Sequence, residues 1–463
     1  MPYKIDETHD PSLESWVESA NDPETDFPIQ NLPLCRFAPP HEWGTPDHFG
    51  TRIGDKILDL TQLSYHVPLS AEGTGSPEEA QLFLGENISD LVPNLCGPLG
   101  HRLRRRIQSL LSASCPTETR SIVAEELFSA VECEFDHSHP CTDYTDFYAS
   151  VFHATNVGSM FRPGNALLPN YKHIPIGYHG RASTVVASGT DIRRPMGQTA
   201  PAEEGGTPGF GPSKLFDYEL EMGLVLGRGN QLGHPISIEE AEDHMLGLCL
   251  LNDWSARDFQ KWEYQPLGPF LAKSFATSVS PYIVTMEALA PFRCPAFERP
   301  AGDPQPLPHL DSDHNRALGG FDITLEVHLA SAQMRERGIS PIRLSKGNFK
   351  DMYWTFAQML AHHASNGCLM QPGDLLGSGT VSGEAKDSRG CLLELTWNGD
   401  AFGDPPKLVP GTDRTAIELP TGEERKFLAD GDEVILKGYC EREGYRRIGF
   451  GECRGIVTPA VRS

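Results

Sequence analysis

Residues 215–227 read LFDYELEMGLVLG, and this stretch indicates what kind of fold to expect. Apolar and acidic side chains alternate around Glu219 and Glu221, a pattern typical of a β-strand because successive side chains of a strand point to opposite faces. The two carboxylates stand two residues apart, so they should lie on the same face. The sequence therefore predicts a strand that carries a pair of acids.

Short strands separated by glycine- and proline-rich turns are expected on both sides of this stretch. After residue 139 the expected strands are STVVASGTDI, ELEMGLVLG, SPYIVTM, FDITLEVHLA, GCLLELTW and DEVILKGYC. Two helices should interrupt them, one beginning near Ser255 and one from Asn348 to about Ser365, which the Asn366-Gly367 pair should end. This pattern favours a large mixed β structure with few helices.

The chain before residue 139 has a pattern of its own. DFPIQNLPLCRF and RIGDKILDLTQL are expected to form short strands, the second as a hairpin that turns at Gly54-Asp55. Apolar spacing from Ala80 to Ala113 predicts two short helices. Because 463 residues exceed what one ordinary core holds, we expect two domains, residues 1–138 and 139–463.

The charge of the chain limits its possible partners. With 63 acidic and 39 basic residues, its net charge of −24 argues against a nucleic-acid-binding surface, which needs clustered Lys and Arg. The one basic run, residues 101–106, is expected on a solvated helix face, opposite Leu103, Ile107 and Leu110. No apolar run reaches the roughly 18 residues that span a bilayer, and no signal-peptide pattern is seen. A cytoplasmic protein that binds a small molecule is the expectation, with its scattered cysteines reduced.

Four acids form a candidate metal site: Asp146, Glu219, Glu221 and Asp253. They stand beside glycine-rich or aromatic segments, and carboxylate oxygens are the ligands that hard cations such as Ca²⁺ and Mg²⁺ prefer. On spacing alone, the alternative of four surface acids on separate elements is favoured, because the sequence links only Glu219 to Glu221.

The stretch DYTDFYASVFHATNVGSMFR, residues 143–162, is unusually rich in ionisable groups. His153 could act as a general base near neutral pH, with an acid to fix its tautomer, and Arg162 could bind a substrate carboxylate through a bidentate fork. A structural histidine and a surface arginine are the alternatives. Four further polar residues recur at helical intervals, which predicts a polar stripe on one side of a helix. The stripe could face either a ligand or solvent, and its residues are Asp253, Arg257, Gln260 and Tyr264.

Taken together, these stretches resemble the fumarylacetoacetase (fumarylacetoacetate hydrolase) family. The likeness is carried, in the family's order, by DYTDFYASVFHATNVGSMFR, NYKHIPIGYHGRASTVVASGTDIRRPMGQ, LFDYELEMG, LNDWSARDFQKWEYQPLGPFLAKSFATSVSP and GDLLGSGTVSG, and it extends to DFPIQNLP and RIGDKILDL. The resemblance implies a mainly β chain with minor α: a small N-terminal SH3-like β barrel followed by a larger, metal-binding C-terminal β-roll that forms a homodimer. It also implies hydrolysis of the carbon–carbon bond of 4-fumarylacetoacetate to fumarate and acetoacetate, the last step of tyrosine and phenylalanine catabolism.

The resemblance further implies a role for particular residues. The implied metal ligands are Asp146, Glu219, Glu221 and Asp253, with Lys273 and Thr277 also around a Ca²⁺ or Mg²⁺ ion. The implied catalytic residues are His153 as base, Glu394 as the acid that orients it, and Arg257, Gln260 and Lys273 as donors to the oxyanion. The implied substrate-binding residues are Tyr148, Arg162, Tyr178, Gln260, Tyr264 and Thr380. Because an ammonium group cannot ligate a cation, we expect Lys273 to act on substrate oxygens. Ala276 stands where relatives commonly carry glycine.

Two other functions compete with this one. Another member of the wider superfamily, such as an acylpyruvate hydrolase or a decarboxylase/isomerase of aromatic degradation, would share the acids but usually lacks the N-terminal domain. A catalytically silent metal-binding or scaffold protein is the second alternative. A paired base and orienting acid, His153 and Glu394, argue against it, because a scaffold does not need them.

Overall fold

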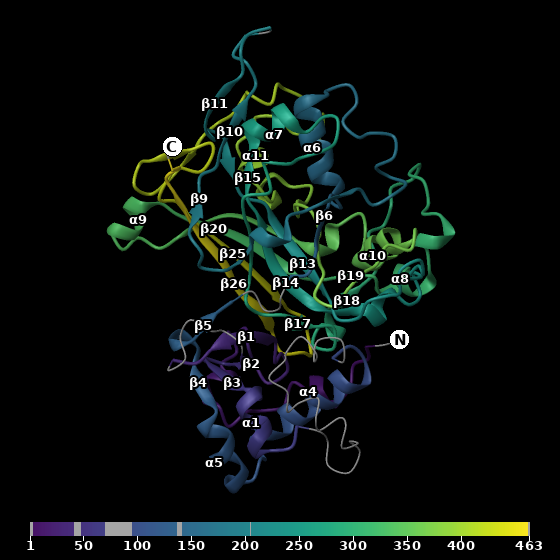
Figure 1. Cartoon of the computed structure of the whole chain (residues 1–463), viewed down its shortest axis with the longest axis vertical. Helices are drawn as coiled ribbons and strands as arrows, with labels where there is room; N and C mark the ends of the chain where they lie inside the picture. The colour runs from purple at the N-terminus through teal and green to yellow at the C-terminus, as the bar shows by residue number, and fades with distance from the viewer. Residues whose placement is uncertain (1–2, 41–47, 70–94, 137–140, 204, 462–463) are drawn as a thin grey trace.

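The computed structural model describes residues 3–40, 48–69, 95–136, 141–203 and 205–461. Figure 1 shows a small N-terminal part, around β1 to β5, below a larger part that holds the longer strands. The chain is mainly β with minor α, which confirms the expected fold class. The expected boundary at residue 138 lies outside the described residues and stays a prediction.

A five-stranded antiparallel sheet, in the order β4-β3-β2-β1-β5, forms the N-terminal part. Its strands are β1 (Leu34–Ala38), β2 (His48–Ile53), β3 (Lys56–Asp59), β4 (Leu127–Ser129) and β5 (Glu134–Phe135). The hairpin of β2 and β3 turns at Gly54-Asp55 as predicted, and Gly54 has a φ of +51°, which favours glycine. The described residues also form α1 (Leu60–His66), α4 (Pro98–Leu111) and α5 (Thr117–Glu125).

The basic run 101–106 lies on α4, and its apolar neighbours Leu103, Ile107 and Leu110 are buried as expected. The expectation of a fully solvated run is wrong for Arg104, whose guanidinium is buried and donates to the backbone carbonyls of Gln30 and Asn31. Arg104 therefore ties α4 to the segment that leads into β1. The rest of the predicted helical region, residues 80–94, lies outside the described residues.

Two mixed sheets form the larger part. The first, eight-stranded, has the order β7-β6-β22-β13-β14-β16-β8, with β17 paired to β14. Its strands are β6 (Tyr144–Phe147), β7 (Gly177–His179), β8 (Val185–Ala187), β13 (Leu220–Leu226), β14 (Met245–Asp253), β16 (Thr277–Val279), β17 (Val284–Thr285) and β22 (Leu375–Gly377). The second, in the order β21-β20-β25-β26-β9, consists of β9 (Ile192–Arg193), β20 (Thr324–Ala330), β21 (Ile342–Asn348), β25 (Glu433–Cys440) and β26 (Ile448–Thr458).

Short strand pairs and helices surround these sheets. The pairs are β10 (Met196–Thr199) with β11 (Gly209–Pro212), β12 (Phe216–Asp217) with β15 (Ser255–Ala256), β18 (Arg293–Cys294) with β19 (Gly320–Phe321), and β23 (Ile417–Glu418) with β24 (Glu424–Arg425). The helices are α6 (Val151–Phe161), α7 (Arg257–Glu263), α8 (Asp313–Leu318), α9 (Ala332–Glu336), α10 (Phe356–Ala364) and α11 (Leu392–Leu395). In the part of the chain that the structure describes, no helix is long and apolar enough to cross a bilayer.

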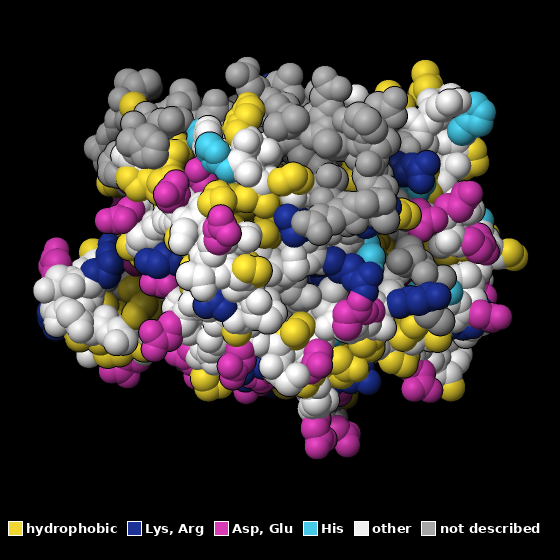
Figure 2. Space-filling view, turned by 90° about the horizontal axis from the view of Figure 1, so that it is seen from below, with side chains coloured by type: hydrophobic (Ala, Val, Ile, Leu, Met, Phe, Trp, Pro, Cys, Tyr) yellow, Lys and Arg dark blue, Asp and Glu magenta, His cyan; other side chains and the backbone are white. Residues whose placement is uncertain are grey.

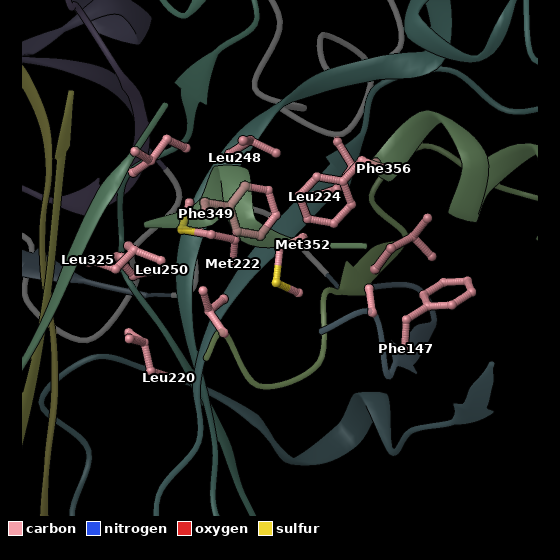
Figure 3. Close-up of a cluster of buried hydrophobic side chains, with 14 of the residues drawn as sticks. Phe147, Leu220, Met222, Leu224, Leu248, Leu250, Leu325, Phe349, Met352 and Phe356 are labelled. Atoms are coloured by element: carbon pink, nitrogen blue, oxygen red, sulfur yellow. The ribbon is translucent and has the colours of Figure 1, made fainter. Parts of the chain in front are cut away.

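The main core lies on one face of β13 and β14. Figure 3 shows Leu220, Met222 and Leu224 of β13 beside Leu248 and Leu250 of β14, with Phe349, Met352 and Phe356 packed near them. The intervening residues of β13 face the other way, and on that side Val225 packs into a cluster shared with the N-terminal part. Glu221 lies on this second face, which directs its carboxylate away from the main apolar core.

Three sequence predictions about local structure need correction. The helix expected near Ser255 begins at Arg257, and Asp253 ends β14, so Asp253 does not belong to the polar helix stripe. The helix expected from Asn348 begins at Phe356, because Asn348 ends β21 and Thr355 forms a capping box with Gln358. GCLLELTW forms the short helix α11 rather than a strand, because a short apolar run does not by itself distinguish the two.

The lower end of the molecule carries charges of both signs. Figure 2, seen from below, shows Asp and Glu side chains interspersed with Lys and Arg and with hydrophobic side chains, singly and in small groups, over the described part of this end. Such a mixture is typical of a solvated surface. The clustered acids are found instead inside the larger part.

Candidate active site and metal centre

Three strands of the eight-stranded sheet, β6, β13 and β14, bring the four candidate acids together, with β22 between β6 and β13. Asp146 lies on β6, Glu221 on β13 with Glu219 directly before it, and Asp253 is the last residue of β14. All four are buried, and one carboxylate oxygen of each lies within 4.8 Å of the others. Four negative charges this close and this far from water repel one another strongly unless a cation compensates them.

The polar atoms of this acid cluster fit a divalent metal ion. Asp146 Oδ1 and Glu221 Oε1 are buried and have no hydrogen-bond partner among the described residues. Burial and the charge of Asp253 raise the pKa of Asp146 well above its ordinary value, and burial and the charge of Asp146 do the same for Glu221. A donor set made only of carboxylate oxygens suits a hard cation. These acids could therefore hold a metal that keeps them ionised.

Two buried cations stand beside the acids. Lys273 Nζ donates to Glu219 Oε2 (2.5 Å) and Asp253 Oδ2 (2.6 Å), and Arg257 Nη1 donates to Glu219 Oε1 (2.6 Å). Burial alone would raise the pKa of Glu219, but Lys273 and Arg257 outweigh it and lower that pKa well below its ordinary value. Arg257 Nη2 is buried without a partner among the described residues, so it is free to donate to a bound molecule.

A second buried group consists of His153 on α6 and Glu394 on α11. His153 Nδ1 lies 2.5 Å from Glu394 Oε2, and Ser150, the N-cap of α6, accepts a hydrogen bond from the backbone N–H of His153. Burial opposes ionisation of Glu394, but His153 and other donors lower its pKa to about 2. An ionised carboxylate only accepts hydrogen bonds, so Nδ1 donates to Glu394, and in that tautomer the lone pair of the imidazole is on Nε2.

Cys391 is close enough to His153 and Glu394 to suggest a metal site, but its chemistry argues for a different role. Its thiol donates to Glu394 Oε2 at 3.2 Å, and burial and the charge of Glu394 raise the pKa of the thiol well above its ordinary value. A cysteine binds metals as the thiolate, which this environment disfavours. The arrangement is that of a base and its orienting acid.

Comparison with known proteins agrees with this geometry. Residues 143–458 match the family model of the fumarylacetoacetate hydrolase C-terminal domain, and residues 30–135 match that of the fumarylacetoacetase N-terminal domain. The chain belongs to the fumarylacetoacetase family. A fumarylacetoacetase of Dictyostelium discoideum is 46% identical over 453 residues, which cover 97% of this chain and 98% of that protein. The human fumarylacetoacetase is 45% identical over 451 residues, which cover 96% and 99%.

The chain is also similar to solved structures of other proteins. The fumarylacetoacetate hydrolase from psychrophilic Exiguobacterium antarcticum matches with a TM-score of 0.46 and 15% sequence identity, covering 92% of this chain and 99% of that one.

Three of the substrate positions implied by the fumarylacetoacetase family, Tyr148, Tyr178 and Gln260, contact residues of the candidate site. The Tyr148 ring packs edge-to-face on His153 at 5.2 Å, and the Tyr178 hydroxyl donates to Asp253 Oδ2 at 3.0 Å. Gln260 Oε1 accepts from Arg257 Nη1 at 3.1 Å, and the buried Thr380 hydroxyl has no partner among the described residues. Their placement leaves polar groups available to a ligand.

Two implied positions are less closely connected to the fumarylacetoacetase site. Arg162 caps the end of α6, and its guanidinium donates to the backbone carbonyls of Asn165 and Ala166. Tyr264 is the C-cap of α7 and is half-buried. Thr277 Oγ1 donates to Asp253 Oδ1 at 3.2 Å, and the neighbouring Ala276 is accommodated in the apolar core. The roles of all these residues stay predictions.

Sequence reasoning missed three buried residues that hold the site in this fumarylacetoacetase family member. Asp217 accepts from Arg257 Nε at 3.0 Å, while Asn156 Nδ2 and Ser382 Oγ donate to Glu394 at 2.9 and 2.8 Å. The alternation in DYELE would have placed Asp217 on the face of Glu219 and Glu221. Asn156 is three residues after His153, a spacing that places both on one side of a helix. Nothing local in the sequence indicates Ser382.

Proposed function

We propose that this protein hydrolyses the carbon–carbon bond of 4-fumarylacetoacetate to fumarate and acetoacetate, the last step of tyrosine and phenylalanine catabolism. The observation that carries this proposal is the meeting of four buried carboxylates in a chain that is 46% identical, over nearly its whole length, to a fumarylacetoacetase. The buried pair of His153 and Glu394 supplies the base that hydrolysis requires.

The proposed cofactor is Ca²⁺ or Mg²⁺, held by the acid cluster. Asp146, Glu219, Glu221 and Asp253 would be the ligands, and the unpartnered oxygens of Asp146 and Glu221 support this assignment. When bound, a divalent cation polarises the carbonyl of the diketone and stabilises the enolate that leaves. Lys273 and Thr277 lie beside Asp253 and would complete the surroundings of the ion.

His153 is the proposed general base. Its Nε2 would take a proton from the water that attacks the carbonyl, while Glu394 holds the ring and stabilises its protonated form. The carbon–oxygen bond forms as the proton moves to the imidazole, and the carbon–carbon bond then breaks to release acetoacetate as its enolate. The enolate takes up one proton and the imidazolium loses one, which restores the base. The low pKa of Glu394, about 2, favours the charged carboxylate throughout this cycle.

Arg257, Gln260 and Lys273 are the proposed donors to the oxyanion of the tetrahedral intermediate. The free Nη2 of Arg257 supports this role, and a donor of this kind contributes on the order of 3 kcal/mol of transition-state stabilisation in related chemistry. The proposed substrate-binding residues are Tyr148, Arg162, Tyr178, Gln260, Tyr264 and Thr380.

The remaining features of the proposal concern the whole chain. It comprises two domains, residues 1–138 and 139–463, a division supported by the separate family-model matches to 30–135 and 143–458. The protein is proposed to be a cytoplasmic homodimer that binds its diketo acid substrate without nucleic acid or membrane. The homodimer rests on the family resemblance.

The decisive experiment follows the absorbance of the enolised diketone with purified protein. Fumarylacetoacetate should be hydrolysed, the activity should disappear with EDTA, and Ca²⁺ or Mg²⁺ should restore it. A parallel assay with an acylpyruvate separates this function from that of the wider superfamily. Metal binding without hydrolysis of either substrate would instead identify a silent scaffold and contradict the proposal.

A further inference from the structure

We infer that Asp217 is a positioning residue that sets the spacing between the two catalytic groups of this site, the His153–Glu394 pair and the Arg257 guanidinium. The inference rests on the proposed function, because it assigns a task within that reaction. Asp217 ends β12 and is fully buried. Its hydrogen bonds go to Arg257 and to backbone groups, and none of those described goes to the acid cluster.

Each oxygen of Asp217 accepts two hydrogen bonds. Oδ2 accepts from Arg257 Nε at 3.0 Å and from the backbone N–H of Leu393 at 3.0 Å. Oδ1 accepts from the backbone N–H of Leu392 at 2.9 Å and from that of Tyr218 at 3.0 Å. One carboxylate therefore bonds directly to the oxyanion donor and to the helix that carries Glu394.

On the Arg257 side, these contacts determine which donor of the guanidinium remains free. Asp217 occupies Nε, while Glu219 and Gln260 accept from Nη1. The guanidinium is planar and its five donors have fixed directions, so holding Nε and Nη1 also fixes where Nη2 points. Nη2 is the nitrogen without a partner among the described residues.

On the base side, Asp217 holds the start of α11. A helix of four residues has little stability of its own, and the first N–H groups of any helix lack a partner within it. Asp217 accepts from two of these groups, and Arg414 donates to the backbone carbonyl of Leu393. The position of Glu394, and through it that of the His153 ring, therefore depends on Asp217.

The proposed reaction requires a fixed distance between the base and the oxyanion donor. The base must reach the attacking water while the free guanidinium nitrogen reaches the oxygen of the same carbonyl. A misplacement of about 1 Å in such an arrangement costs on the order of 100-fold in rate. The side chain of Asp217 connects the Arg257 guanidinium to the helix that carries Glu394. It therefore holds the distance between the guanidinium and the His153–Glu394 pair more directly than the loops that join β12, α7 and α11.

Asp217→Asn is the first test, because it keeps the shape of the side chain and removes its charge and one acceptor. We expect kcat to fall at least about 100-fold, while KM and the affinity for Ca²⁺, measured by calorimetry, change less than about threefold. Asp59→Asn is the matched control. Asp59 is also fully buried, accepts from the N–H of Gln62 at the start of α1 and pairs with His48, but belongs to the N-terminal part. Its variant should keep kcat within about twofold.

A double-mutant cycle with Arg257→Met distinguishes positioning from general structural support. If Asp217 acts partly by holding Arg257, the fold-decrease in kcat of the double variant Asp217→Asn/Arg257→Met should be smaller than the product of the fold-decreases of the two single variants. The difference should be at least about tenfold. Losses that simply multiply overturn the inference. The double variant removes both buried charges, so it tests the idea even if Asp217→Asn does not fold: kcat within about tenfold of Arg257→Met supports it, and a greater loss overturns it.

The wild-type protein separates this inference from the proposed function. If the wild type does not hydrolyse fumarylacetoacetate, the proposed function fails. If the wild type and Asp59→Asn hydrolyse it and Asp217→Asn does so within about threefold of the wild type, only the positioning role fails.

Discussion

Glu394 accepts hydrogen bonds from the side chains of four residues: His153, Asn156, Ser382 and Cys391. Several fixed donors hold a carboxylate in one orientation and favour its ionised form, which agrees with a pKa of about 2 against an ordinary value of 4.5. Because this pKa is depressed, the stabilisation is present above about pH 4.5 and is lost as the pH falls toward 2. The pair therefore stays intact over the neutral range.

Replacing His153 by alanine should lower kcat at least about 1,000-fold, because a positioned general base accelerates a reaction by a factor on the order of 10²–10⁴. Metal content, measured by atomic emission, should not change, since His153 belongs to a separate cluster from the four acids. His328→Ala is the control, because His328 also pairs with a glutamate, Glu326, on β20. Activity of His153→Ala within tenfold of the wild type would discard its role as base.

Replacing Glu219 by glutamine should weaken the binding of Ca²⁺ or Mg²⁺ at least about tenfold, because an amide is a poorer ligand than a carboxylate. The variant also loses part of its attraction for Lys273 and Arg257. Calorimetric titration with each metal measures the effect. Glu242→Gln provides the comparison, because Glu242 is likewise buried and paired, with Arg293 and His314. Equal affinities for the metal in Glu219→Gln and the wild type would contradict the ligand assignment.

At the scale of elements, β22 separates β6 from β13 and has to leave room for their acids. A Cβ atom at Gly377 would lie 2.8 Å from Asp146 Oδ1 and 3.1 Å from Glu221 Oε2. These are the ends of side chains and can move, so an added methyl group would displace the carboxylates rather than disrupt the strand. A small residue here is thus a condition for the geometry of the acid cluster.

Gly377→Ala should therefore lower metal affinity, by about tenfold or more, with only a modest decrease in the melting temperature. The expectation follows from the direction of the added methyl group, which meets carboxylate oxygens instead of backbone. Metal titration and thermal unfolding, done on the same samples, separate the two effects. Gly211→Ala on β11 is the control, because its Cβ would meet open space. Unfolding of Gly377→Ala together with unchanged metal affinity would refute this view of β22.

Alternation along the chain was sufficient to predict that Glu219 and Glu221 share one face. It could not show that Asp146 and Asp253 join them, because this depends on the order β6-β22-β13-β14, in which β6 and β22 come from segments far from β13 and β14 in the sequence. Their place in the acid cluster came from the family resemblance. A periodicity of two describes one strand and carries no information about which strand lies beside it.

Local patterns also failed where another part of the fold determines the structure. The run around Leu392 and Leu393 is buried on all sides, so its apolar residues show no helical or strand period. Its helix start is held by Asp217, which precedes it by 175 residues or more. The sequence likewise places Arg104 in a solvated basic run, because the carbonyls that it bonds belong to another segment. The spacing of residues along the chain cannot predict hydrogen-bond partners that are this far away in the sequence.

At the scale of the whole molecule, the N-terminal part packs directly on the eight-stranded sheet that carries the acid cluster. Leu34 and Leu58 belong to the same apolar cluster as Val225 and Ile283, and Leu34 pairs with Ile283 through backbone hydrogen bonds. Arg104 of α4 and Glu287, which follows β17, are buried at this junction. Burial raises the pKa of Glu287 to about 7, against the opposing charge of Arg104.

The junction should make stability depend on pH. Because the pKa of Glu287 is raised on folding from an ordinary value of 4.5 to about 7, the folded protein holds this proton more tightly than the unfolded chain. The stabilisation is fully present below about pH 4.5 and is lost as the pH rises through 7. Above that range an ionised carboxylate has to remain buried, which costs on the order of 3 kcal/mol.

Glu287→Gln should therefore raise the free energy of unfolding at pH 8, by up to about 3 kcal/mol, and should flatten its decrease between pH 5 and 8. Urea titrations at several pH values measure both effects, with metal present throughout so that the acid cluster stays bound. Glu336→Gln on α9, an exposed position, is the control and should leave the curve unchanged. If Glu287→Gln is less stable at pH 8 than the wild type, the Glu287 carboxylate is ionised and stabilised by Arg104. This result would contradict the prediction.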